Sequence, residues 1–170
     1  MTKNIMIVGV GGQGSLLASK LLGHLLLSEG YDVKVSEVHG MSQRGGSVVT
    51  YVRFGEKVYS PIIDKGEADV IVSFEKLEAA RYLEYLKPDG RIITNTQEID
   101  PMPVITGAME YPKDLIAKLE TTGVKVDAII TDPPYGTTAC KWDSVIPFDE
   151  MWKRLNKLIK PNGAIVLFGS

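Results

Sequence analysis

The sequence predicts an α/β fold, a single domain built on a doubly wound, mostly parallel sheet with helices on its faces. Short β-rich apolar runs alternate with segments whose apolar residues recur at helical spacing, and this alternation is typical of a parallel sheet. The chain has 170 residues and a hydrophobic content of 44%, which fills one core. Two independent enzymes do not fit in this length.

The elements follow one another at ordinary spacing. Residues 4–10 are a β-rich run that stops at a glycine pair, and residues 15–30 carry apolar positions at helical spacing. The expected elements after these are a strand at 31–38, a hairpin over 45–60 that turns at 54–56, a strand at 68–74, a helix at 75–86, a strand at 91–96 and a helix at 112–123.

Two stretches of the chain share a layout. "ADVIVSF…YLEYLKPDGRIITN" and "VDAIITD…LNKLIKPNGAIVLF" both give a buried strand, a loop, a helix, a Lys-Pro-Asp/Asn-Gly turn and another buried strand. We interpret them as two ordinary βαβ units of one sheet rather than as a true duplication.

Composition narrows the functional classes. Charged residues make up 24% and the net charge is −2, which argues against disorder and against tight DNA binding by the chain alone. One cysteine cannot form an intramolecular disulfide or supply the four thiolates of a typical iron–sulfur cluster. The apolar runs are too short to span a membrane. We therefore expect an unexported cytoplasmic protein with no membrane contact.

A glycine loop follows the first strand. Gly9, Gly11 and Gly14 satisfy G-x-G-x-x-G, with Gly12 beside them, and Glu37 stands at the end of the next strand. Such glycines let a phosphate approach a helix N-terminus, and a carboxylate in that place can hold a ribose. The alternative is that the glycines only allow close strand–helix packing. In either case the expected architecture is a Rossmann-like three-layer α/β fold.

The segment after Glu37 carries a family resemblance. The run "EVHGMSQRGGSV", together with "IVGVGGQGSLLASKLL", "VYSPII" and "ADVIVSFEKLEAARYLEYLKPDGRIITNT", resembles the small subunit of indolepyruvate ferredoxin oxidoreductases. More broadly, it resembles the gamma domain of 2-oxoacid:acceptor oxidoreductases. The resemblance covers residues 1–126.

The resemblance implies a role in oxidative decarboxylation of an aryl 2-oxoacid such as indolepyruvate to an acyl-CoA, with electrons passed to ferredoxin. Thiamine diphosphate and the iron–sulfur clusters are then expected on a larger partner subunit, so the isolated chain is not expected to be catalytic or to hold a metal. A loop would shape the partner interface or the substrate side of the shared site, and its residues are His39, Ser42, Gln43, Arg44, Gly45 and Gly46. For His39 and Arg44, a role in a structural turn is the alternative.

Residues 127–170 resemble a different group, the DNA amino-methyltransferases. Asp132, Pro133, Pro134 and Tyr135 directly follow an apolar strand, and "KWD" and "IKPNG" come after them. In that chemistry Asp132 and the Pro133 carbonyl would accept the hydrogens of a flipped base's amine, and Tyr135 would stack on the base. S-adenosylmethionine would be the cofactor and DNA the partner. A rigid Pro-Pro turn is the alternative.

The two resemblances together suggest a chimera that folds as one domain, with residues 1–126 from the oxidoreductase subunit and 127–170 from the methyltransferase. Three functional classes follow: an oxidoreductase subunit, a DNA adenine methyltransferase, and a folded chimera with neither activity.

Overall fold

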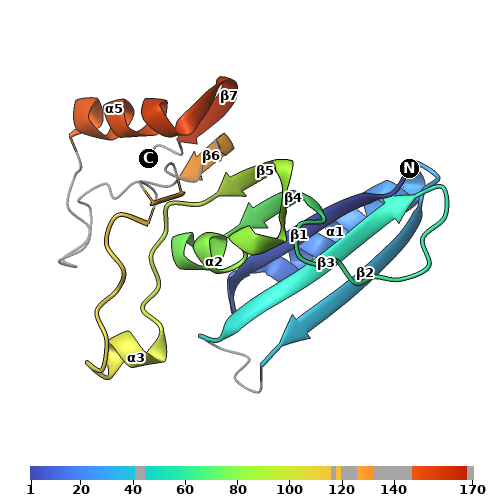
Figure 1. Ribbon diagram of the computed structural model, residues 1–170, viewed down its shortest axis with the longest axis horizontal. Helices are drawn as coiled ribbons and strands as arrows, with labels where there is room; N and C mark the ends of the chain where they lie inside the picture. The colour runs from blue at the N-terminus through green and yellow to red at the C-terminus, as the bar shows by residue number, and fades with distance from the viewer. Residues whose placement is uncertain (41–44, 116–117, 120–125, 132–146, 168–170) are drawn as a thin grey trace.

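The computed structural model describes residues 1–40, 45–115, 118–119, 126–131 and 147–167, and Figure 1 shows one mixed sheet running through them. The sheet has seven strands among the described residues, in the order β2-β3-β1-β4-β5-β6-β7. The strands are β1 (Lys3–Val10), β2 (Asp32–His39), β3 (Ser47–Gly55), β4 (Ala68–Ser73), β5 (Leu86–Thr94), β6 (Val126–Thr131) and β7 (Ile159–Leu167). The helices are α1 (Ser15–Ser28), α2 (Lys76–Arg81), the 3-10 turn η1 (Leu83–Tyr85), α3 (Met102–Ile105) and α5 (Phe148–Leu158).

The parallel part of the sheet confirms the predicted fold class. β1, β4, β5, β6 and β7 are successive parallel neighbours. The chain leaves β1 through α1 toward β2 at one edge, whereas it leaves β4 through α2 toward β5 in the other direction. Because crossovers are right-handed, α1 and α2 cover opposite faces of the sheet, α1 over β1, β2 and β3 and α2 over β1, β4 and β5 (Figure 1). The winding therefore reverses between β1 and β4.

β3 departs from the prediction. It lies between β1 and β2 and is antiparallel to both. The hairpin expected over residues 45–60 is wrong, because β3 runs unbroken to Gly55 and no strand follows in residues 56–67. β3 is already hydrogen-bonded to β1 on one side and to β2 on the other, so residues 56–67 cannot form a strand beside it. They are held instead by Arg53, whose Nη1 donates to the carbonyl oxygens of Ser60 (3.3 Å) and Ile62 (2.5 Å).

The two similar stretches fold in the same way. In β4-α2-β5, Ala68 pairs with Leu86 and Val70 pairs with Arg91. Between these two pairs β4 advances by two residues, whereas β5 advances by five. In β6-α5-β7, residue 126 pairs with residue 159 and residue 128 pairs with residue 164, so β7 has the same extra residues. Each Lys-Pro-Asp/Asn-Gly sequence is therefore an insertion inside a strand rather than the turn before it. The helix predicted over 75–86 is correspondingly shorter, because β5 begins at Leu86.

Gly90 shows why the insertion ends in glycine. A Cβ at this position would lie 2.6 Å from Leu86 Cδ1 and 3.0 Å from the Ala68 carbonyl oxygen. The close approach of the two strands leaves no space for a side chain there.

Part of the helix predicted over 112–123 is described: Leu115, Lys118 and Leu119 are helical, and both leucines are buried. Within the described residues, no helix has the length and apolarity that crossing a membrane requires.

Candidate functional site

The candidate site lies at the carboxyl ends of β1 and β4, where the winding of the sheet reverses. In open α/β sheets this is the place where ligands usually bind. Two segments singled out from the sequence meet here. The Gly11 amide donates to the Gly46 carbonyl oxygen at 2.8 Å, and the Gly45 amide donates to the Gly11 carbonyl oxygen at 3.4 Å. The glycine loop and the end of the His39–Ser47 loop are thus joined as one surface.

The glycines have conformational reasons to be glycines. Gly12 and Gly14 have φ values of 104° and 85°, in the left-handed region that side chains disfavour. Gly14 directly precedes the first residue of α1. Gly9 is restricted by space, because a Cβ there would lie 2.9 Å from Gln13 Oε1 and 3.1 Å from Phe74 Cβ.

Gln13 links the ends of β1 and β4. Its Oε1 accepts from the Val10 amide at 2.7 Å, and its Nε2 donates to the Phe74 carbonyl oxygen at 2.9 Å. The same Nε2 donates to Gln97 Oε1 at 3.0 Å. The side chain therefore folds back across the point where the winding reverses and fixes the loop against both strands.

Glu37 is not brought to the glycine loop. β3 lies between β1 and β2, so Glu37 is separated from β1 by one whole strand. Along the strands it stands opposite Thr50, which in turn pairs with Ile7, three positions before the end of β1 at Val10. In a dinucleotide-binding βαβ unit the strand with the acidic residue is next to the first strand, and here it is not.

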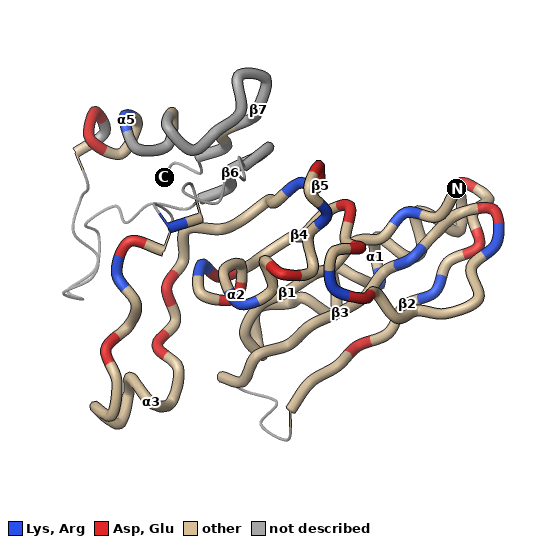
Figure 2. Tube along the Cα trace, in the orientation of Figure 1, with Lys and Arg blue, Asp and Glu red and all other residues tan. Residues whose placement is uncertain are grey.

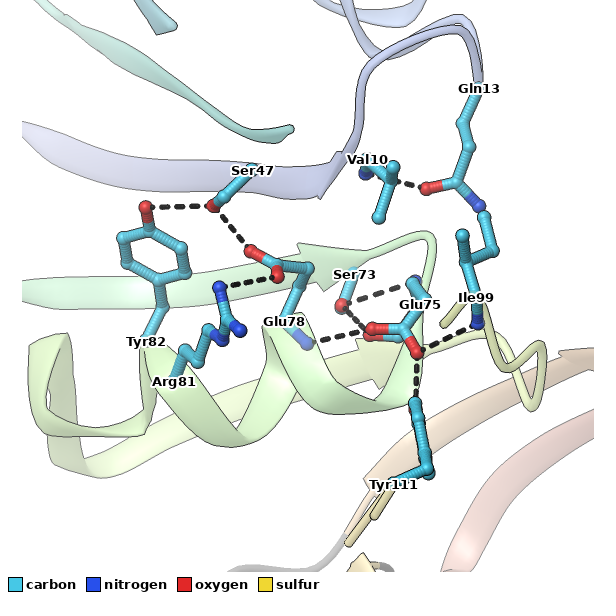
Figure 3. Close-up of polar contacts among 10 residues, drawn as sticks. All are labelled: Val10, Gln13, Ser47, Ser73, Glu75, Glu78, Arg81, Tyr82, Ile99 and Tyr111. Carbon is cyan, nitrogen blue, oxygen red and sulfur yellow. Dashed lines mark hydrogen bonds and ion pairs between the residues drawn. The ribbon is translucent and has the colours of Figure 1, made fainter. Parts of the chain in front are cut away.

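Glu78 of α2 holds the exit of the His39–Ser47 loop. Its side chain is 3% exposed, and it accepts from Ser47 Oγ at 2.5 Å and pairs with Arg81 at 3.3 Å (Figure 3). Tyr82 Oη lies 3.2 Å from the same Ser47 Oγ. Burial raises the pKa of Glu78 above its ordinary value, while the contacts with Ser47 and Arg81 oppose the rise and the nearby Glu75 adds to it.

Glu75 holds a second segment, residues 95–111. It is 1% exposed, and as the N-cap of α2 it accepts from the Glu78 amide at 2.9 Å. Its other oxygen accepts from the Ile99 amide at 3.3 Å and from the Tyr111 hydroxyl (Figure 3). Burial, followed by the hydrogen bond to Glu75, raises the pKa of Tyr111.

The remaining predicted site residues are less informative. His39 is exposed, and its Nδ1 lies 3.1 Å from the Gly40 carbonyl oxygen. Ser42, Gln43 and Arg44 lie outside the described residues, as do Asp132, Pro133, Pro134 and Tyr135. Within the part of the chain that the structure describes, no group of three or more His, Cys, Asp or Glu side chains could hold a metal ion.

Comparison with known proteins identifies the family. Residues 4–141 match the family described as pyruvate ferredoxin/flavodoxin oxidoreductase. The chain belongs to this family. It is 57% identical over 109 residues to the indolepyruvate oxidoreductase subunit IorB of Thermococcus kodakarensis, which covers 64% of this chain and 54% of the relative. It is 41% identical over 128 residues to the IorB subunit of Archaeoglobus fulgidus, covering 74% of this chain and 63% of the relative.

A solved structure supports the fold alone. The 2-oxoglutarate:ferredoxin oxidoreductase of Magnetococcus marinus matches with a TM-score of 0.51 and 16% sequence identity, over 72% of this chain and 22% of that one. The chain spans about half the length of the Thermococcus relative.

The family match changes the interpretation of the C-terminal part. It runs to residue 141, past the boundary expected at 126 and across Asp132–Tyr135. Neither this match nor the relatives support a methyltransferase segment or a chimera.

Sequence reasoning missed the residues that hold the site together: Gln13, Ser47, Glu75, Glu78 and Tyr111. A signal existed for one pair only. Glu75 and Glu78 stand three apart at a helix start, the spacing of a capping box, which indicates an N-cap but not the segments that it binds.

Proposed function

We propose that this chain acts as the small subunit, without thiamine diphosphate, of an indolepyruvate:ferredoxin oxidoreductase. The observation that carries the proposal is the identity of 57% over 109 residues to an indolepyruvate oxidoreductase subunit. Thiamine diphosphate and the iron–sulfur clusters would lie on a large subunit, in agreement with the single cysteine among these 170 residues. The substrate would be an aryl 2-oxoacid and the electron acceptor ferredoxin.

Within that assembly, the joined surface of the glycine loop and Gly45–Gly46 would face the large subunit or its substrate. Two hydrogen bonds between Gly11 and this glycine pair support the proposal, because they fix the end of the His39–Ser47 loop to the glycine loop that follows β1. Glu78 supports it further by holding Ser47 at the loop's exit.

The test is reconstitution with the large subunit of the Thermococcus kodakarensis enzyme. The complex is purified through a tag on that subunit, and indolepyruvate-dependent ferredoxin reduction is measured. Gly45→Val is compared with Gly66→Val, because both glycines have nearly the same φ, 77° and 78°, and neither has a heavy atom within 4 Å of an added Cβ. Each substitution costs about 1–2 kcal/mol of backbone strain.

We expect Gly45→Val to lower the rate at least tenfold relative to Gly66→Val at equal melting temperature. Failure of the unaltered chain to co-purify would refute the proposed function. Equal rates for the two variants would refute only the role of the loop.

A DNA methyltransferase is the other activity that the sequence suggested, and the parallel strand β6, which ends at Thr131 directly before Asp132, is equally expected of both hypotheses. The family match across these residues favours the first hypothesis. Calorimetric titration with S-adenosylmethionine separates them, and we expect no saturable binding up to millimolar cofactor.

A further inference from the structure

The segment between β5 and Tyr111, residues 95–111, is here named the 95–111 arm. Figure 1 shows it projecting away from the sheet, with α3 at its far end. The three large apolar side chains there, Met102, Ile105 and Met109, are 63%, 65% and 65% exposed. Met102 and Ile105 stand three apart in α3, so they are neighbours on its surface. We call these three residues the tip.

The tip is an ordered turn rather than an extended loop. Pro101 precedes α3, and its carbonyl oxygen accepts from the Val104 amide at 2.8 Å. The Met109 amide donates to the Pro103 carbonyl oxygen at 3.0 Å, which closes the turn over the helix. The amides of Ile105 and Met109 are thus hydrogen-bonded within residues 101–109, while the apolar side chains of the tip are largely exposed.

The base of the arm is fixed on both legs by one buried carboxylate. Glu75 Oε1 accepts from the Ile99 amide on the outgoing leg and from the Tyr111 hydroxyl on the returning leg (Figure 3). The Lys76 amide also donates to the Gln97 carbonyl oxygen at 3.1 Å. An element held in one conformation before binding loses less entropy when it binds.

The charge of the arm has one sign. Glu98, Asp100 and Glu110 flank the tip, and no Lys or Arg occurs between Arg91 and Lys113 (Figure 2). Glu98 pairs with Lys76 at 2.6 Å, whereas Glu110 is 3.7 Å from the exposed Lys113, a contact worth little in water. Asp100 and Glu110 therefore leave an acidic margin around an apolar tip.

We propose that the 95–111 arm docks into the large subunit of the complex, its tip entering an apolar groove with a basic rim. The inference rests on the proposed function for the identity of the partner. Three observations fit this occupant: methionine is enriched at interfaces, the acidic margin calls for basic residues opposite, and the fixed base pre-organises the tip. The arm lies inside the family match.

The experiment measures the dissociation constant for the large subunit with the full chain, by biolayer interferometry. Ile105→Asp/Met109→Asp changes the tip, and Leu25→Asp/Leu27→Asp is the matched control, because these leucines are 58% and 55% exposed and lie at the end of α1 that is away from the glycine loop. Asp100→Lys changes the margin, and Asp89→Lys, at an exposed site in the insertion of β5, is its control. Circular dichroism melts check that all variants fold.

We expect the tip variant to weaken binding at least thirtyfold and Asp100→Lys to weaken it three- to tenfold at low salt, with each control within twofold of the unaltered chain. Tip variants that bind normally would overturn the docking role and leave the proposed function standing. Absence of binding by the unaltered chain would overturn both. Self-association of the unaltered chain that the tip variant abolishes would assign the tip to a second copy and overturn the stated partner.

Discussion

Helices α1 and α2 cover opposite faces of the same sheet, but they are held to it by different means. α1 turns small residues toward the sheet at intervals of four, Ser15, Ser19 and Gly23, all buried. Its outward side carries exposed leucines at positions 16, 17, 21, 25 and 27. α2 has six residues, buries Glu78, and begins at the buried Glu75.

Because α1 and α2 are held to the sheet in different ways, different substitutions should destabilise the two faces. α1 can lie close to β2 and β3 because its inward residues are small. Larger side chains at these inward positions should therefore destabilise its packing on the sheet. α2 is too short for its own propensity to hold it, and it is secured by hydrogen bonds that Glu78 and its N-cap Glu75 accept from other segments. The packing of α2 should therefore be most sensitive to the loss of these hydrogen bonds.

Removing the Glu75 carboxylate should have the largest effect. Glu75→Ala leaves the Ile99 amide, the Tyr111 hydroxyl and the Glu78 amide without their acceptor. Breaking a buried network of this kind costs about 3 kcal/mol of the free energy of unfolding, measured by urea denaturation. Glu98→Ala is the control, since this exposed residue forms an ion pair with Lys76, and it should change the free energy of unfolding by less than about 0.5 kcal/mol. Similar values for the two would show that the face of α2 depends on packing instead.

Enlarging Ser19 tests the other face. Its side chain is fully buried on the side of α1 that faces the sheet, so Ser19→Leu must push the helix from the sheet and should cost about 2 kcal/mol in the same urea assay. Lys20→Leu is the control, because it places the same leucine side chain one position away on the exposed side, where we expect the free energy of unfolding to change by less than about 0.5 kcal/mol. A neutral Ser19→Leu would mean that α1 is loosely packed.

The sequence predicted the fold class, the first strand and helix, and the echo between the two βαβ units, because all three depend on local periodicity. It did not predict that β3 enters between β1 and β2, since the pairing of a strand with distant partners leaves no local pattern. For the same reason Glu37 looked like a ribose ligand: its spacing from the glycine loop fits a dinucleotide fold, and only the position of β3 separates the two.

The site was predicted in part. The glycine loop and Gly45–Gly46 were identified separately, and the structure adds that they are hydrogen-bonded to each other. Gln13 and Ser47 lie inside the two motifs and Tyr111 outside them, but all three are ordinary residue types whose partners the sequence does not indicate, because their contacts span up to 84 residues of sequence. The helical spacing in α1 predicted the helix but not that its smallest residues face the sheet.

Thr50 allows a gain of stability on the face of α1. Its Oγ1 is buried and is the only such side-chain atom without a hydrogen-bond partner among the described residues. Thr50→Val replaces the hydroxyl by a methyl group of similar shape, and removing a buried group that has no partner should stabilise the fold by about 1 kcal/mol. Val49→Thr, a reverse change at the adjacent buried position, should destabilise it. A loss of stability in Thr50→Val would show that a water molecule satisfies the hydroxyl.

Glu78 should give the smallest effect, visible as a pH dependence. Burial raises its pKa above the ordinary 4.5, so the folded chain keeps a proton that the unfolded chain has lost. The stabilising contribution of this group is therefore complete below pH 4.5 and declines as the pH rises through the folded-state pKa. Glu78→Gln removes this decline, so the stability of the variant relative to the unaltered chain should increase across that window and then level off. The effect is small because Ser47 and Arg81 oppose burial. Ser47→Ala removes one of these opposing contacts and should make the decline of stability with pH steeper. The same decline in Ser47→Ala as in the unaltered chain would show that the Ser47 hydrogen bond does not affect the titration of Glu78.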